Sequence, residues 1–173
     1  MYGICTSQLS DFILDCSRKN EDQHIDYYIQ FGGDASRCDE DGRNAAHHFA
    51  MRGNAKGLNA LALDDMTPFE KADKYGMTPL MYLAERSTQD VMPYAVQRPQ
   101  LLAQTDLKHR SIAGFIAAKG DLDTVLGKMM PICPEIRFQR IISMVMSSLT
   151  LDPMEKIRMV RILGHEGFET KSI

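Results

Sequence analysis

The sequence lacks the features that mark several large classes of protein. Its four cysteines, Cys5, Cys16, Cys38 and Cys133, form no Cys-x-x-Cys pair, and no histidine pair follows at zinc-finger spacing. Charged residues interrupt every apolar stretch well before the roughly 18 residues that a membrane-spanning helix needs. The first residues show no basic segment followed by an apolar one. We therefore expect free thiols in the cytoplasm, with no metal site, signal peptide or membrane insertion.

Motifs that carry catalysis or cofactor binding are also missing. The chain has no Gly-x-Ser-x-Gly elbow, no Gly-x-Gly-x-x-Gly or phosphate-binding loop, and no His-Glu-x-x-His. The adjacent His47 and His48 would point in different directions on a helix. The acidic run Asp39-Glu40-Asp41 could hold a cation, but a solvated turn explains it more simply. We predict no enzyme, no catalytic residue and no cofactor, with a site in the C-terminal helices as a remote alternative.

The charge is too weak and too dispersed for a nucleic-acid-binding protein, which would cluster lysine and arginine on one face. The 173 residues carry a net charge of −3, with 44% hydrophobic and 25% charged residues. Residues 1–90 contain 15 acids and 9 bases, whereas residues 91–173 contain 8 acids and 11 bases. The two ends should therefore prefer different charges in a partner. Length and composition suit one ordinary folded domain.

Three segments share a pattern that begins with an aspartate. They are residues 39–47, 73–81 and 106–114, and their leading aspartates are 34 and 33 residues apart. In an Asp-x-x-Gly turn the carboxylate bonds local backbone amides, while glycine accepts a positive φ. Thr78 and Ser111 should then cap the next helix, and Pro79 suits its first turn. Small residues that let helices stack closely follow: Ala45, Ala46, Ala50, Ala84, Ala113, Ala117 and Ala118.

A return helix should complete each repeat. Residues 120–126 predict a helix break, a cap and an apolar return helix. Residues 27–35 predict a helix end with Gly32 in the left-handed conformation, and residues 159–167 repeat that ending. Pro93 and Pro99 should kink or end the return helix of the repeat that contains them.

These motifs resemble those of the ankyrin-repeat family, whose period is about 33 residues. The resemblance covers residues 5–130 well and residues 135–168 loosely. It departs at Asn44, Ala45 and Ala46, which replace Thr-Pro-Leu, and at His109 and Ile112, which replace glycine and proline. It implies an all-α fold, an ankyrin-type helix-turn-helix repeat solenoid with helical caps. It also implies that His47 bonds backbone groups between turns.

The expected repeats span residues 1–134, with an N-terminal cap or repeat at about 5–38 and further repeats at 39–72, 73–105 and 106–134. Residues 135–173 should form a longer helical hairpin that covers the end of the stack. The sequence 152–155 predicts a capping box at the start of its second helix. The apolar faces of the two helices should comprise Phe138, Ile141, Ile142, Val145 and Leu149, then Ile157, Val160 and Leu163.

The resemblance implies a protein partner that docks on the concave face, where turn tips and inner helices meet. Met51 and Met77 should be exposed there as adaptable contacts. Carried over by position, the partner-binding residues are Glu40, Asp41, Arg43, Met51, Arg52, Lys74, Tyr75, Met77, Glu85, Arg86, Leu107, Lys108, Arg110 and Lys119. Reversing Lys108 and Arg110 to glutamate should weaken capture of the partner without lowering the melting temperature.

Two functions fit such a module. One is a cytoplasmic adaptor or inhibitor. The other is a secreted bacterial effector, translocated into a host cell and acting on a host protein. Degenerate ankyrin proteins resemble such effectors, and the polar residues 166–172 suit a translocation signal as well as an ordinary frayed end. The sequence leaves the partner's identity and the oligomeric state open.

Overall fold

A computed structural model of the chain describes residues 5–87 and 90–169, with side chains described up to residue 165. It divides into two compact units, unit 1 at residues 1–94 and unit 2 at residues 95–173. Within the described ranges the regular structure is helical, and Thr105 and Ser111 form an isolated antiparallel bridge. No described helix combines the length and the apolar character needed to cross a membrane. The fold is thus the predicted all-α repeat architecture.

Unit 1 consists of paired helices whose starts follow the predicted signals. Its helices are α1 (Thr6–Lys19), α2 (Ile25–Gln30), α3 (Ala45–Arg52), α4 (Ala55–Asp64), α5 (Thr67–Glu70) and α6 (Pro79–Arg86). Asn44 caps α3 by accepting a bond from the His47 amide, and Asn54 caps α4 through the Gly57 amide. Pro79 opens α6, as predicted. Asparagine therefore replaces the usual threonine cap of the first copy without loss of the cap bond.

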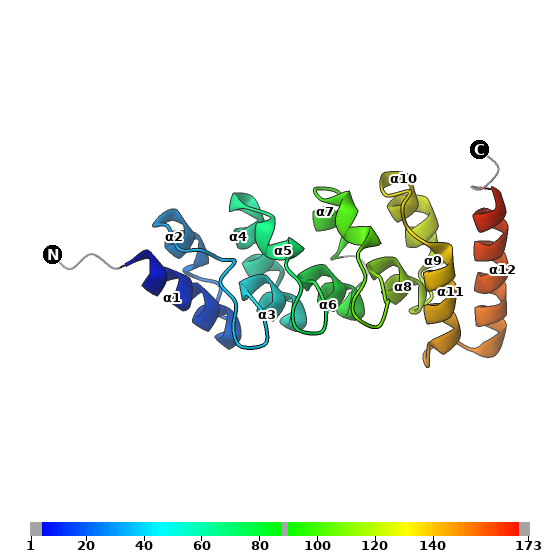
Figure 1. Ribbon diagram of the computed structural model, residues 1–173, viewed down its shortest axis with the longest axis horizontal. Coiled ribbons are helices and arrows are strands. Elements are labelled where there is room, and N and C mark those ends of the chain that lie inside the picture. Colours follow the sequence, from blue (N-terminus) through cyan, green and yellow to red (C-terminus); the bar gives the residue numbers. More distant parts are fainter. Residues whose placement is uncertain (1–4, 88–89, 170–173) are drawn as a thin grey trace. The chain divides into compact units, whose positions relative to one another are not determined.

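The inner helices of unit 1 lie side by side, with α3 between α1 and α6, and their return helices lie to one side (Figure 1). Close stacking follows from small residues, since Ala45, Ala46, Ala50 and Ala84 are all buried. Phe49 fills the remaining space as a fully buried ring.

Unit 2 begins with short, irregular helices. α7 (Met92–Ala95) crosses the unit boundary, and the following elements are η1 (a 3₁₀ helix, Pro99–Ala103), α8 (Ile112–Ala117), α9 (Leu122–Thr124), η2 (a π-helical turn, Val125–Met129) and α10 (Met130–Ile132). The return segment is divided into two short helices. α7 ends at Ala95 and Pro99 opens η1, as predicted, whereas Pro93 lies in the first turn of α7 and does not end that helix. Ser111 caps α8 through the Gly114 amide, and Asp121 caps α9 through the Thr124 amide.

Of the two longer helices that follow, the first packs against α8 and the second packs against the first (Figure 1). They are α11 (Phe138–Ser147) and α12 (Pro153–Glu169). Gly114 of α8 permits the close approach, because a Cβ at that position would collide with the sulfur of Met144 on α11. The Ser148 hydroxyl after α11 donates to the Ala118 carbonyl at 2.7 Å, closing the end of α8. Asp152 caps α12, as predicted.

The apolar faces of the C-terminal helices differ in part from the prediction. Leu149 is fully exposed because α11 ends at Ser147, and Ile157 is exposed as well. Met159 and Leu163 form the buried face of α12 in place of Ile157. The predicted repeat boundaries stay a prediction.

One predicted cap bond is not formed. Thr78 precedes α6 with the extended backbone of a capping residue, but its side chain accepts no bond from the helix. Its buried hydroxyl has no hydrogen-bond partner within the described part of the chain. The amide of Met81, at the third position of α6, donates to the Thr78 carbonyl at 3.0 Å instead of to its hydroxyl.

Candidate functional site

Each of the three predicted turns is held by its leading aspartate. In the first turn, Asp39 Oδ1 accepts bonds from the amides of Asp41 and Arg43, both at 2.9 Å. The same two bonds recur in the turns led by Asp73 and Asp106, with lengths of 2.8 to 3.0 Å. The aspartates therefore fix the backbone of the turn tips, and the side chains between them project from a rigid base.

The fourth residue of each turn adopts a left-handed backbone. Gly42 and Gly76 have φ values of 77° and 75°, and His109 takes the same place with φ 60°. A side chain in this region costs roughly 1 kcal/mol or more relative to glycine. The third turn therefore keeps its shape despite the departure from Asp-x-x-Gly.

The second oxygen of Asp39 binds His48, which lies on α3. His48 Nε2 lies 3.0 Å from Asp39 Oδ2, and Arg18 Nη2 approaches the same oxygen at 3.7 Å. Burial alone would raise the pKa of Asp39, but bonds from the Arg43 amide and from His48 hold that pKa below its usual value. His48 therefore acts as a second anchor for the first turn.

The second turn is joined to the first by a network around Asp73, whose side chain is fully buried. The Tyr82 hydroxyl donates to Asp73 Oδ2 at 2.6 Å, and Arg43 Nε donates to the same oxygen at 3.3 Å. Burial and this bond to Asp73 raise the pKa of Tyr82 to about 12. Arg43 also donates to Asp41 Oδ2 at 3.1 Å, so a single guanidinium joins both turns.

Tyr75 is the main exposed aromatic group at the turn tips of unit 1, with half of its surface accessible. The Arg43 guanidinium lies 5.7 Å from the centre of its ring, and the Lys74 ammonium lies 5.1 Å from it. These cation–π contacts, each worth about 0.5 to 1 kcal/mol at an exposed site, favour this orientation of the ring. The ammonium of Lys74 also pairs with the Asp41 carboxylate. The tip thus presents an ordered aromatic ring among paired charges.

His47 performs the predicted structural role. Its Nε2 lies 3.1 Å from the Met77 carbonyl of the next turn, and its Nδ1 faces the Asn44 cap. Burial lowers the pKa of His47 to about 4, so the ring is neutral at pH 7. His47 thereby links the start of α3 to the base of the second turn.

Arg52 and Arg86, both predicted partner contacts, also serve the stack itself. Arg52 donates to the Arg18 carbonyl at 2.6 Å, and Arg86 donates to the Met51 carbonyl at 3.2 Å. Each arginine therefore satisfies a carbonyl at or near the end of the preceding inner helix. Their guanidinium groups are exposed, and each also forms a hydrogen bond within the stack.

The structure places most of the predicted contact residues on the surface. Exposed members of the set are Glu40, Arg52, Lys74, Tyr75, Glu85, Arg86, Leu107, Lys108 and Lys119. Partly buried members are Asp41, Arg43, Met51 and Arg110. The expected exposure of Met77 is wrong: the residue is 3% exposed, because its backbone forms the base of the second turn and is bonded by His47 and Asp73.

The third turn is stabilised by its own residues. Arg110 Nε and Nη2 both lie 2.7 Å from Asp106 Oδ2, and the guanidinium stacks 4.9 Å from the Phe115 ring centre. Reversing Arg110 would therefore disturb the turn, which contradicts our expectation that the melting temperature would not change. Of the two residues in the charge-reversal prediction, Lys108 and Arg110, only Lys108 can be changed without removing a side chain that supports the turn.

Sequence reasoning missed Tyr82 and Arg140 as residues of these surfaces. Tyr82 lies on α6 outside the repeated motif, and only its spacing from Asp73 could have suggested a bond. Arg140 comes from α11, far along the chain from the third turn, and its Nη1 donates to Thr105 Oγ1 at 3.2 Å. No local pattern signals such a contact.

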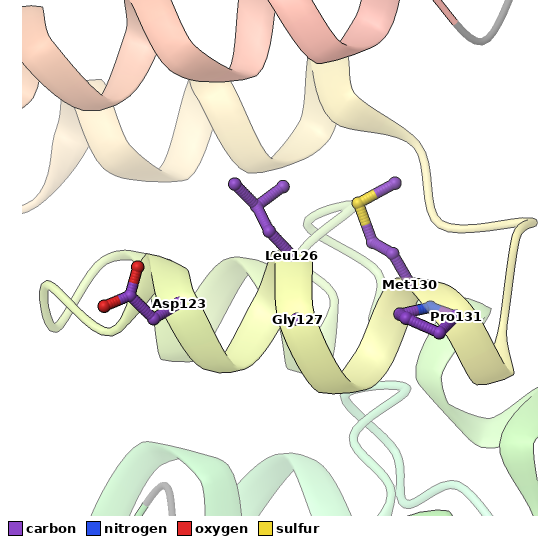
Figure 2. Close-up of a pocket in the computed structure, with 5 residues that line it drawn as sticks. All are labelled: Asp123, Leu126, Gly127, Met130 and Pro131. Carbon is purple, nitrogen blue, oxygen red and sulfur yellow. The ribbon is translucent and has the colours of Figure 1, made fainter.

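A hollow of about 530 Å³ lies along the π-helical turn in unit 2. Figure 2 shows Leu126 and Met130 extending from the same side of this segment, with Asp123 at one end and Pro131 near the other. Among the residues that the structure describes, Asp123 is the single charged one in the lining, so no acid–base pair of described residues converges there. Among the described residues no group of three metal-binding side chains occurs, and the four cysteines are free.

Comparison with known families agrees with this geometry. The sequence model of the ankyrin-repeat family matches residues 13–106 as three copies. The match covers more than half of the chain, which therefore belongs to the ankyrin-repeat family. A comparison with curated proteins found no match. Ankyrin repeats are generally protein–protein interaction modules and are typically not enzymes.

Proposed function

We propose that the chain binds a partner protein through the turn tips and inner helices of its repeats, the face that is concave in a repeat stack, and that it catalyses no reaction. A cytoplasmic adaptor, an inhibitor and an effector translocated into a host cell would all use this surface. The observation that carries the proposal is the ordered display of Tyr75 at a turn tip.

A tyrosine held in this way suits binding for an energetic reason. Tyrosine and arginine are enriched among the residues that dominate binding energy, and a side chain fixed before binding loses little entropy on contact. Tyr75 is held by Arg43 and Lys74, and the turn beneath it is anchored by buried Asp73. The turn tip is thus prepared for binding without the partner.

Affinity capture with matched variants tests the proposal. The full chain would be immobilised as wild type, as Lys74→Ala/Tyr75→Ala, and as the control Lys56→Ala/Leu63→Ala. The control removes one exposed lysine and one exposed apolar side chain from α4, on the return side of the repeat. We expect proteins captured by the wild type to be depleted about tenfold or more by the turn-tip variant, since a central aromatic residue typically contributes about 2 kcal/mol.

Quantitative mass spectrometry would compare the three captures. The control should retain the same proteins at wild-type amounts. Equal retention by the turn-tip variant and the wild type would overturn the proposed surface, and equal depletion by both variants would indicate general surface adhesion instead. Circular dichroism on all three chains would show that they remain folded.

A further inference from the structure

A basic hollow lies beside the third turn in unit 2. Its volume is about 590 Å³, and it is bounded by the turn, by the end of α8 and by α11. Lys108, Arg110 and Arg140 line it, together with the uncharged Ser143, and none of its described lining residues is acidic. A hollow with this lining attracts anionic groups.

Lys108, Arg110 and Arg140 differ in how freely each can pair with a bound anion. Arg110 is paired with buried Asp106 and stacked on Phe115, so it contributes positive potential from a fixed place. Arg140 is held by its bond to Thr105. Lys108 is exposed, and its ammonium makes no hydrogen bond or ion pair with any residue in the described ranges. Lys108 is therefore the group best able to meet an incoming anion.

Unit 1 shows how one turn of this chain receives another. The Lys74 amide donates to the Asp41 carbonyl at 2.9 Å, and the Lys74 ammonium pairs with the Asp41 carboxylate. Asp41 is the third residue of its turn, and Lys74 is the second residue of the turn that docks on it. One backbone bond and one ion pair thus join the first turn to the second.

The third turn offers the same position with the charge reversed. Its third residue is Lys108, in the place that Asp41 occupies in the first turn. No aspartate-led turn follows, because the chain enters α11 at Phe138. Across residues 5–87 and 90–169, no backbone amide donates to the Lys108 carbonyl. The edge of the third turn therefore keeps an exposed acceptor, an exposed cation and an adjoining hollow.

We propose that this edge receives an acidic, turn-forming segment of the partner protein, with a carboxylate paired to Lys108 and steered by Arg140. A backbone amide of the segment would donate to the Lys108 carbonyl, as the Lys74 amide does to Asp41. The inference rests on the proposed function, since it names the chemistry that the partner presents to the third turn.

A peptide-binding experiment tests this inference on the full chain. The probe is a fluorescein-labelled cyclic peptide with an Asn-Gly turn flanked by aspartate and glutamate, measured by fluorescence anisotropy at about 50 mM salt. The variant Lys108→Ala/Arg140→Ala removes two lining cations, and Lys128→Ala/Arg158→Ala removes two exposed cations elsewhere in unit 2. We expect the pocket variant to bind about tenfold more weakly and the control variant to bind within about twofold of wild type.

A charge swap sharpens the test. Lys108→Asp recreates the residue found at Asp41, so this variant should reject the acidic peptide and bind a matched peptide in which lysine replaces the acids. Because the Lys108 side chain has no partner within the described residues, its melting temperature should match that of the wild type. This reversal cannot arise from a folding defect.

Each remaining outcome decides against the inference. A control peptide carries asparagine and glutamine in place of the aspartate and glutamate. If it binds as tightly as the acidic peptide, the carboxylate charge plays no part in binding. Stronger competition by inorganic phosphate or by a short single-stranded DNA would assign the hollow to phosphoryl groups. The acidic peptide could also fail to bind while the Lys74→Ala/Tyr75→Ala variant still loses capture of partner proteins. That result would contradict this inference and would support the proposed function.

Discussion

The turns of unit 1 and the turn of unit 2 have the same backbone but different side-chain supports. In unit 1, Arg43 and Tyr82 join Asp73 to the neighbouring turn. In unit 2, Asp106 is paired with Arg110 of its own turn. The comparison shows that a repeat motif can be held either by a network between repeats or by a local ion pair.

The two supports have different consequences for binding. The network in unit 1 uses the turn charges internally, so Asp41 and Lys74 neutralise each other. The local pair in unit 2 uses Arg110 and leaves Lys108 unpaired among the described residues. Under the proposed function, unit 1 would therefore offer a partner mainly the Tyr75 ring, and unit 2 would offer it the Lys108 ammonium.

The largest difference should appear when the leading aspartates are removed. Asp73→Ala breaks four bonds around a fully buried carboxylate and leaves Arg43 and Tyr82 without their partner. We expect it to lower the free energy of unfolding by about 3 to 5 kcal/mol. Asp106→Ala should cost about 2 kcal/mol, because Arg110 is partly exposed and can be hydrated.

Urea unfolding would measure both changes, with Asp64→Ala as an exposed control expected to change the free energy by less than about 0.5 kcal/mol. Equal losses for Asp73→Ala and Asp106→Ala would show that the network between repeats adds nothing beyond the turn itself.

Acid should weaken unit 1 through His47. The pKa of the buried ring is about 4, below the value of 6.5 expected in the unfolded chain. The unfolded state therefore binds a proton more readily, and stability that is fully present above pH 6.5 is lost as the pH falls toward 4. We expect a loss of about 2 kcal/mol between pH 7.5 and pH 5.

Urea unfolding at both pH values would test this, with His47→Gln as the comparison. The glutamine variant should be less stable at pH 7.5 but should show a smaller loss on acidification. A wild-type chain with the same pH dependence as the variant would contradict the assignment to His47.

The smallest effect concerns the left-handed residue of the third turn. His109→Gly should raise the free energy of unfolding by about 0.5 to 1 kcal/mol, because glycine adopts φ 60° without strain. Gly76→Ala, at the equivalent place in unit 1, should lower it by about 1 kcal/mol or more. Thermal unfolding would compare them, and a destabilised His109→Gly chain would reveal that the imidazole itself supports the turn.

The sequence predicted the parts of this molecule that depend on local chemistry. The Asp-led turns, the left-handed Gly32 and the Asp121 and Asp152 caps follow from residue types at fixed spacing. The break before Pro99 in the third return segment follows for the same reason. These features are confirmed because each depends on neighbours within a few residues.

Features that depend on distant packing were not predictable. The burial of Met77 is set by the turn base and by His47 from another repeat. The exposure of Leu149 depends on where α11 ends, and the approach of α11 depends on Gly114 meeting Met144. The basic hollow exists only because Arg140 comes beside the third turn from α11.

A further repeat would both bury the apolar side of α8 and dock a turn against the third turn. α11 and α12 follow α8 instead, and only the first of these two tasks is performed. α11 shields the apolar flank of α8 and α12 covers α11, but within the described residues neither helix brings a turn against Lys108. Burial of the core is thus complete without that edge, and a change at position 108 should alter partner choice at little thermodynamic cost. Single substitutions at position 108 would then change the binding preference of this edge while the fold stays the same.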